Sequence, residues 1–303
     1  MKSATGTIKN SSFSLILADF KEITKMRLAL SVVFSSISGY FLGAYELQLF
    51  SILLLAFGGY CMVGASNAFN QVIERDLDAL MKRTQNRPIP AGRMSVNTAM
   101  TIAIVLTILG VLSLYLLSPK TAMFGAISIF LYTSVYTPLK TKTPLSVFVG
   151  AIPGAIPFML GWVAATDDFS IEPGTLFMIQ FFWQFPHFWA LGWMLDEDYK
   201  KGGFKMLPTG KKDKGTALQI ILYTIWMIVI SIMPVFGFTG RLHLSIPAAI
   251  LIFIMGLVML IFGFKLYVKR DNKAARYLML SSVSYITFMQ IVYVIDRFGE
   301  TLF

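Results

Sequence analysis

The chain has 303 residues, of which 56% are hydrophobic and only 14% are charged, whereas a soluble domain has about 45–50% apolar and about 25% charged residues. The net charge of +10 does not indicate nucleic acid, because the basic residues lie in short breaks between apolar runs of about 20 residues, the length that spans a bilayer. Cys61 is the only cysteine, which excludes a disulfide framework and a cysteine-based metal site. The composition therefore predicts a polytopic membrane protein.

The apolar runs predict an all-α fold with nine transmembrane helices, because lipid offers no hydrogen-bond partner to free backbone groups and the runs are too long for barrel strands. We expect a single nine-helix domain over residues 26–303, preceded by a cytoplasmic segment, residues 1–25. In chain order the helices are expected near 26–44, 49–69, 96–117, 121–136, 145–165, 173–195, 216–236, 243–265 and 277–296.

The loop charges predict the orientation. All lysines and arginines except Lys120, Arg241 and Arg297 fall in the N-terminal segment or in the loops after the second, fourth, sixth and eighth runs. By the positive-inside rule, these loops and the N-terminus are cytoplasmic. The apolar stretch 13–17 is too short for a signal peptide, and the first arginine is Arg27, so no Arg-rich transit peptide is expected either. We therefore expect a multi-pass protein of a bacterial inner membrane. Residues 19–27 predict either a short interfacial helix or a solvated flank.

A first polar cluster follows the second run. Asn70, Glu74 and Asp78 are spaced i, i+4, i+8, and on a continuing helix they form one stripe. Oxygen ligands at this spacing suit Mg²⁺, which shares its coordination with phosphate oxygens. Arg83 and Arg87 follow, and arginine binds phosphate in a bidentate manner. The segment predicts a diphosphate site, or else a loop helix whose acids and bases pair in water.

A second acidic cluster, Asp196 to Asp198, follows the sixth run on the same predicted side. Asp198 lies eleven positions after His187, so both can face one side of a continuing helix. An ionisable residue inside an apolar helix is a candidate site residue. The alternative for His187 is a neutral imidazole hydrogen-bonded to a facing helix.

Two further residues lie at the cytoplasmic end of the fourth run. Tyr136 and Lys140 are one helical turn apart, on the same predicted side as both acidic clusters. Lys140 can reach a bound diphosphate or can simply anchor the helix end.

These parts suit transfer of a prenyl group, in which an allylic C–O bond ionises, cations stabilise the diphosphate and the allylic cation is shielded from water. Aromatic rings stabilise such a cation. Aromatic side chains are dense beside the second cluster, although contact with lipid explains such residues as well: Phe181, Phe182, Trp183, Phe185, Phe188 and Trp189.

On these motifs the chain resembles the intramembrane UbiA-type prenyltransferases, and within them the branch that farnesylates haem. The superfamily pattern of Asn with acids at +4 and +8 matches Asn70, Glu74 and Asp78, and R-T-x-x-R-P matches residues 83–88. The haem-specific block is W-Q-x-P-H-F-W at residues 183–189. Further agreement comes from Y-T-x-x-L-K, G-A-x-P-G-A-x-P at 150–157, D-Y at 198–199 and M-L-P at 206–208, so the resemblance covers nearly the whole chain from about residue 20.

The resemblance implies nine helices around a central cavity, with Mg²⁺ at its cytoplasmic mouth. The implied substrates are farnesyl diphosphate, haem B and water, and the products are haem O and diphosphate. A haem A synthase or a terminal oxidase is a candidate partner for the product. The implied ligands of Mg²⁺ are Asn70, Glu74, Asp78 and Asp198; the implied diphosphate-binding residues are Arg83, Arg87, Lys140 and Tyr136; the implied catalytic residues are His187, Asn70 and Asp198. For His187 two roles stay open, as an iron ligand or as the base that delivers water.

The chain departs from the superfamily pattern at Gln71 and Met194, where many members carry aspartates, so one metal ion is favoured over two. A prenyltransferase for another acceptor, such as a hydroxybenzoate, a quinone precursor or a chlorophyll precursor, is the nearest alternative. The His-containing block argues against it. A secondary transporter would place its polar residues near the midplane on inverted repeats, and a non-catalytic assembly factor would leave the acids unexplained.

Overall fold

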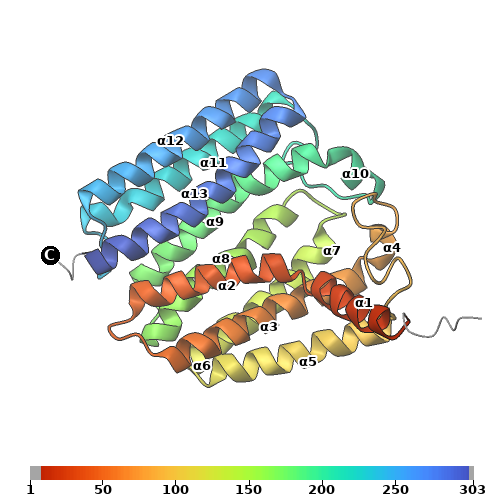
Figure 1. Ribbon diagram of the computed structural model, residues 1–303. Coiled ribbons are helices and arrows are strands. Elements are labelled where there is room, and N and C mark those ends of the chain that lie inside the picture. Colours follow the sequence, from red (N-terminus) through yellow and green to blue (C-terminus); the bar gives the residue numbers. More distant parts are fainter. Residues whose placement is uncertain (1–7, 300–303) are drawn as a thin grey trace, which may run out of the picture.

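The structure is a computed structural model that describes residues 8–299, and every regular element within this range is helical (Figure 1). In chain order these are α1 (Ile8–Ile23), α2 (Met26–Gly43), α3 (Leu49–Ile73), α4 (Arg75–Asp78), α5 (Val96–Tyr115), α6 (Pro119–Phe130), the π-helix η1 (Leu131–Tyr136), α7 (Thr137–Leu139), α8 (Ser146–Thr166), α9 (Ile171–Met194), α10 (Asp196–Lys201), α11 (Lys214–Ile232), the 3₁₀-helix η2 (Met233–Phe236), α12 (Ile246–Lys269) and α13 (Asn272–Gly299). The predicted all-α membrane fold is confirmed.

Eight segments within residues 8–299 are long and apolar enough to cross a membrane. They correspond to eight of the nine predicted spans. The remaining one is α9, which has 24 residues and carries Glu172, Gln180, Gln184 and His187 among its apolar side chains. The count of nine spans and the cytoplasmic N-terminus stay predictions.

Consecutive long helices run antiparallel and form one bundle (Figure 1). One side holds α2, α3, α5 and α6, the other holds α9, α11, α12 and α13, and α8 packs against both α2 and α9. The short helices α4 and α10 lie at the same end of the bundle (Figure 1). The loops rich in lysine and arginine therefore gather at one end, as the alternation of charge predicted.

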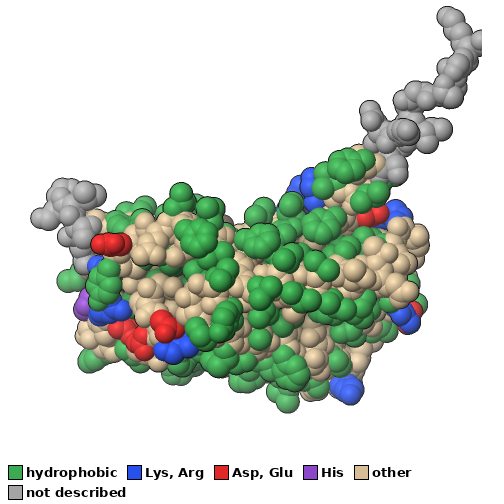
Figure 2. Space-filling view, turned by 90° about the horizontal axis from the view of Figure 1, so that it is seen from below, with side chains coloured by type: hydrophobic (Ala, Val, Ile, Leu, Met, Phe, Trp, Pro, Cys, Tyr) green, Lys and Arg blue, Asp and Glu red, His purple; other side chains and the backbone are tan. Residues whose placement is uncertain are grey.

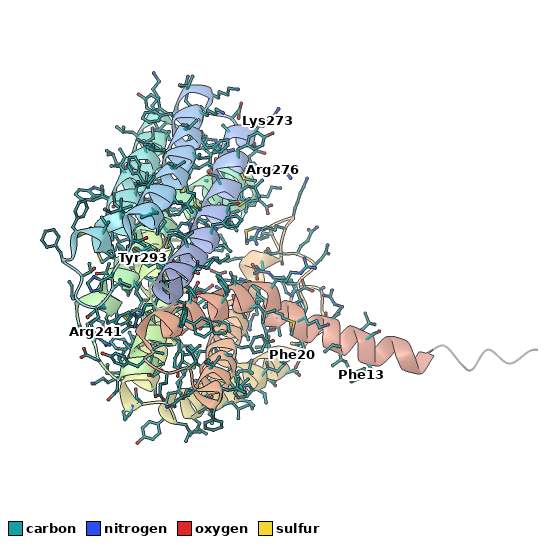
Figure 3. All side chains as sticks on the ribbon, turned by 60° about the vertical axis from the view of Figure 1, so that its left-hand side comes forward. Phe13, Phe20, Arg241, Lys273, Arg276 and Tyr293 are labelled. Atoms are coloured by element: carbon teal, nitrogen blue, oxygen red, sulfur yellow. The ribbon has the colours of Figure 1, made fainter. Side chains whose placement is uncertain are left out.

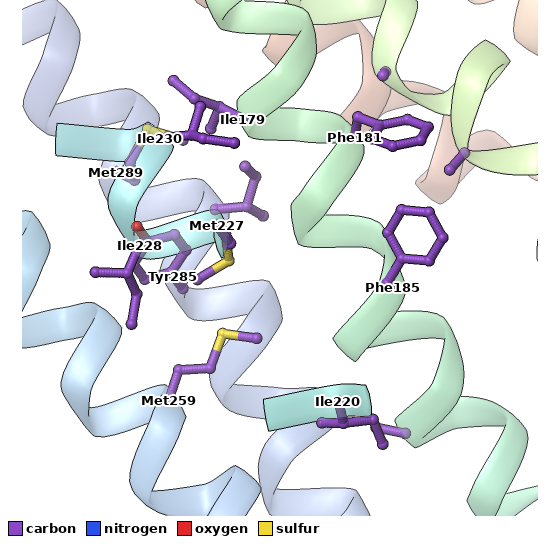
Figure 4. Close-up of a cluster of buried hydrophobic side chains, with 14 of the residues drawn as sticks. Ile179, Phe181, Phe185, Ile220, Met227, Ile228, Ile230, Met259, Tyr285 and Met289 are labelled. Atoms are coloured by element: carbon purple, nitrogen blue, oxygen red, sulfur yellow. The ribbon is translucent and has the colours of Figure 1, made fainter. Parts of the chain in front are cut away.

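The larger apolar core lies between α9, α11, α12 and α13 (Figure 4). Phe185 on α9, Met227 on α11, Met259 on α12 and Tyr285 on α13 are all at most 2% exposed. Within this core α9 packs directly against α11 and α13, and α12 packs against α11 and α13.

The contact of α2 with α8 depends on two glycines. A Cβ added to Gly161 would lie 1.8 Å from the carbonyl oxygen of Ser36, and one added to Gly39 would lie 2.0 Å from that of Phe158. Small residues let membrane helices approach this closely. The backbones of α2 and α8 are therefore in direct contact.

The surface follows the expectation for a bilayer protein. Apolar side chains cover the middle of the face in Figure 2, and charged side chains gather toward its ends. Arg241 lies at the opposite end of the bundle from Lys273 and Arg276 (Figure 3), in line with the predicted separation of charges.

The helix predicted over residues 19–27 differs from the one observed. α1 begins at Ile8 and ends at Ile23, because Lys25 has a left-handed backbone (φ 47°) that breaks the helix before α2. Gln71 donates to the carbonyl oxygens of Glu22 and Ile23 at 3.2 and 3.0 Å, which fixes the end of α1 against α3. Phe13 is 72% exposed on the part of α1 that projects from the bundle (Figure 3). The predicted N-terminal segment also includes residues 1–7, which lie outside the described range.

Candidate active site

The first acidic motif lies where α3 passes into α4. Glu74 is the residue between the two helices, yet its amide donates to Asn70 and that of Asp78 donates to Glu74, at 2.9 and 2.7 Å. The i, i+4, i+8 spacing is therefore kept through the junction. Asn70, Glu74 and Asp78 are only 1%, 3% and 0% exposed, so this stripe faces the protein interior and is not a solvated loop helix.

Each carboxylate of the stripe has a cationic partner. Glu74 Oε1 lies 2.8 Å from Lys140 Nζ, and Asp78 Oδ2 lies 2.6 Å from Arg87 Nη1. Lys140 also lies 4.6 Å above the ring of Tyr136, within the range of a cation–π interaction. Two acids and two bases predicted for the site are thus paired with each other.

The fourth span presents Tyr136 and Lys140 through a π-helix. Pro138 has no amide hydrogen, so it cannot complete the α-helical pattern, and Thr137 N donates to Tyr132 O five residues back. Such widened turns are frequent at functional sites. Thr137 Oγ1 in turn accepts from Asn70 Nδ2 at 3.2 Å, which fixes the Asn70 amide against the π-helical end of the fourth span.

The Gly/Pro run of α8 makes room for these side chains. A Cβ on Gly150 would lie 2.6 Å from the ring of Tyr136, and one on Gly154 would lie 2.0 Å from Gln184 Oε1. Glycine at position 150 therefore lets α8 pack directly on the rigid Tyr136 ring of η1, and glycine at position 154 leaves room for the Gln184 side chain of α9 in its observed conformation.

Asp198 brings the second acidic motif to the first. Its carboxylate oxygens accept from the backbone amides of Lys82 and Arg83 at 2.8 and 3.2 Å. Burial opposes ionisation, but these two donors lower the pKa of the Asp198 carboxyl. The side chain of Arg83 lies 5.8 Å from the Tyr199 ring. Asp198 thus holds the loop that follows α4, and its predicted metal-binding and catalytic roles stay predictions.

The oxygen atoms of the stripe fit Mg²⁺. Asp78 Oδ1 is buried and has no hydrogen-bond partner, so it is available to a cation. Residues 8–299 contain no group of three His, Cys, Asp or Glu arranged as metal ligands. A site of one or two carboxylates completed by substrate phosphates and water is, however, the ordinary form for Mg²⁺.

Lys25 is a site cation that the sequence reasoning assigned only to the positive flank. Burial, followed by the charges of Arg87, Lys140 and Arg83, lowers the pKa of Lys25 to about 7. Four cationic side chains therefore influence one another around Glu74. No local pattern distinguishes Lys25 from other lysines at helix ends, and only the fold brings its charge near those of Glu74, Arg87 and Lys140.

His187 lies on α9, seven residues before the last residue of that helix, which is a rise of about 10 Å along the helix axis. Its Nδ1 is 2.8 Å from Ser282 Oγ on α13, and its ring stacks on Trp183 with centroids 4.9 Å apart. His187 is therefore not part of the acid–cation cluster. Ser282 was not predicted, because the contact joins helices 95 residues apart.

The aromatic residues of α9 divide into two sets. Phe181, Phe185 and Trp189 are at most 8% exposed and pack inside the bundle, partly against Tyr223 of α11 and Phe148 of α8. Contact with lipid does not explain these three. Phe182, Trp183 and Phe188 are only partly buried.

Comparison with known proteins agrees with this fold. Residues 32–289 match the model of the UbiA prenyltransferase family. A protoheme IX farnesyltransferase of Christiangramia forsetii is 70% identical over 93% of this chain and 94% of its own. One of Flavobacterium psychrophilum is 68% identical over 93% and 95%, and one of Listeria monocytogenes is 33% identical over 96% of each.

Solved structures share the fold at low identity. A digeranylgeranylglyceryl phosphate synthase has a TM-score of 0.77 at 17% identity over 93% of this chain and 98% of its own. A UbiA homologue from Archaeoglobus fulgidus bound to GPP and Mg²⁺ has a TM-score of 0.67 at 15% identity over 91% and 99%. The fold and the paired acidic motifs define an intramembrane helical bundle with a buried charged site at the end where α4 and α10 lie (Figure 1). The chain belongs to the UbiA prenyltransferase family.

Proposed function

We propose that this protein transfers the farnesyl group of farnesyl diphosphate to a vinyl group of haem B, with addition of water, to give haem O and diphosphate. The observation that carries this proposal is the 70% identity, over 93% of the chain, to a protoheme IX farnesyltransferase. The buried pairing of the stripe with Lys140 and Arg87 supports the same chemistry.

The charged site would bind the diphosphate head. Asn70, Glu74, Asp78 and Asp198 would hold Mg²⁺, which supplies positive charge to the departing diphosphate when bound. Lys140 and Arg87 now neutralise the two acids, and a metal ion there would let both cations turn to phosphate oxygens. Tyr136 positions Lys140 through its ring, while Arg83 and Lys25 add charge at the edge of the site.

The reaction balances without a redox step. The bond between C1 of the farnesyl chain and the diphosphate oxygen breaks, and the electron pair leaves with diphosphate. The terminal vinyl carbon of haem bonds to C1, and water adds to the adjacent carbon and loses one proton. Exclusion of bulk water from the apolar bundle prevents water from capturing the farnesyl cation first.

The proposed setting is a bacterial inner membrane, with nine spans, the N-terminus in the cytoplasm and the charged site at the cytoplasmic face. Its support is the distribution of basic residues, which lie mainly in the predicted cytoplasmic segment and loops; Lys273 and Arg276 lie at one end of the bundle and Arg241 at the other (Figure 3). The prenyl chain would then lie among the helices with its diphosphate in contact with the cytosol.

The test uses the full-length chain in lipid nanodiscs with labelled farnesyl diphosphate and either haem B or 4-hydroxybenzoate. We expect farnesylated hydroxyethyl haem that depends on Mg²⁺ and is lost in EDTA. Glu74→Gln should lower turnover by at least 100-fold. Asp76→Asn is the matched control, because Asp76 is 87% exposed beside the stripe and should leave turnover unchanged. Prenylated hydroxybenzoate without prenylated haem would reject the acceptor, and full activity of Glu74→Gln would reject the metal site.

A further inference from the structure

We infer that Ser282 is a positioning residue for haem: it holds His187 in the tautomer whose Nε2 is free of hydrogen, and Nε2 binds the haem iron. This inference rests on the proposed function, since it assumes that haem is the acceptor. It decides between the two roles that the sequence left open for His187.

The tautomer follows from where the hydroxyl hydrogen of Ser282 points. Ser282 Oγ lies 2.7 Å from the carbonyl oxygen of Met279, and a carbonyl oxygen only accepts, so the hydroxyl hydrogen is used there. His187 Nδ1 lies 2.8 Å from Ser282 Oγ. Because the hydroxyl hydrogen is already used, Ser282 Oγ can only accept a hydrogen bond from this nitrogen. His187 Nδ1 must carry the hydrogen, and in the neutral ring Nε2 keeps its lone pair.

A second contact fixes the plane of the ring. Trp183 stands one turn before His187 on α9, and its indole Nε1 donates to the backbone oxygen of Ser282 at 2.7 Å. The two rings are stacked at 19°. Ser282 is 0% exposed, so both anchors lie inside the contact of α9 with α13. Rotation of His187 would break its bond to Ser282 and the stack on Trp183.

Residues 8–299 offer His187 Nε2 no hydrogen-bond partner, and the side chain is only half-buried. Histidines that bind a metal donate their second ring N–H to a neighbouring acceptor, which orients the ring and raises its basicity. Haem iron takes a neutral imidazole in this way. In this protein Ser282 Oγ accepts the hydrogen bond from His187 Nδ1. Within the described residues, the contacts of the His187 ring include no carboxylate that could take this role instead.

The experiment measures haem ligation apart from turnover. Full-length protein in nanodiscs is titrated with haem B, and absorption spectra and the iron–histidine stretching frequency of the ferrous complex are recorded. His187→Ala should lose the histidine-ligated spectrum, and added imidazole should restore it. Ser282→Ala should weaken haem binding by about 10-fold or more and lower the stretching frequency, because the imidazole no longer donates from Nδ1.

Two variants separate this role from packing. Ser282→Thr keeps a hydroxyl acceptor and should retain the wild-type frequency. Ser281→Ala removes a hydroxyl that likewise donates to the carbonyl three residues back, at 2.8 Å from Leu278 O, but touches no ring, so it should change nothing.

An unchanged frequency and affinity in Ser282→Ala would overturn the inference. So would a histidine-ligated spectrum in His187→Ala, and so would loss of turnover in that variant with an unchanged haem spectrum, which would make His187 the base. Histidine-ligated haem that the wild-type protein never farnesylates would instead reject the proposed function and leave the Ser282 contact standing.

Discussion

The buried ion pair of Asp78 and Arg87 should stabilise the loop over residues 79–94, in addition to its proposed role in binding substrate. The two side chains are 1% and 10% exposed and 2.6 Å apart. At an effective dielectric constant of about 20, two unit charges at that distance attract by roughly 6 kcal/mol. Desolvation offsets much of this attraction, and breaking such a pair from one side costs about 3–5 kcal/mol, because the remaining charge stays buried.

Asp78→Asn or Arg87→Met alone should therefore loosen residues 79–94. Amides there bond within the loop, as in Arg87 N to Thr84 O at 2.9 Å, and hydrogen exchange reports their opening free energy. The expected increase in exchange is roughly 100- to 5000-fold, since each 1.4 kcal/mol is about a factor of ten.

The double variant Asp78→Asn, Arg87→Met removes both charges and should recover most of the protection without recovering activity, because the proposed ligands of Mg²⁺ and phosphate are both gone. The exposed pair Arg75 and Asp76, 3.5 Å apart, is the matched control, and its neutralisation should change little. If the double variant exchanged as fast as the sum of the two single effects predicts, the structural role of the Asp78–Arg87 pair would be refuted. Single variants that exchange like the wild type would refute it as well.

Two further predictions follow from single residues. The lowered pKa of Lys25, about 7, leaves a growing fraction of its amine neutral as the pH rises, so calorimetric affinity for farnesyl diphosphate should fall from about pH 7 to 9 with proton uptake on binding. Lys25→Arg, which stays charged, should flatten that profile, and an equal slope in both proteins would contradict the assignment. Gly161→Ala should lower the melting temperature in nanodiscs sharply, since its Cβ would stand 1.8 Å from the Ser36 carbonyl oxygen. Gly59→Ala, whose Cβ would meet Val33 at an ordinary 3.6 Å, should be tolerated, and similar melting of the two variants would argue against a backbone contact.

The sequence alone predicted the long helices and the spacing of the first acidic motif, because both are local patterns. Apolar runs of about 20 residues must be helical in lipid, and their predicted limits agree with the helices to within a few residues. The i, i+4 spacing of Asn70, Glu74 and Asp78 needs only a backbone that stays close to helical, which it does through the junction at Glu74.

The tertiary structure decided which groups meet. Asp198 reaches the amides of Lys82 and Arg83 across 116 and 115 residues, and Ser282 meets His187 across 95. Such contacts depend on the crossing of helices, which glycines such as Gly161 set by letting backbones touch. A single sequence records the residue types that suit a site, but the direction of each side chain follows from packing against helices far away in the chain.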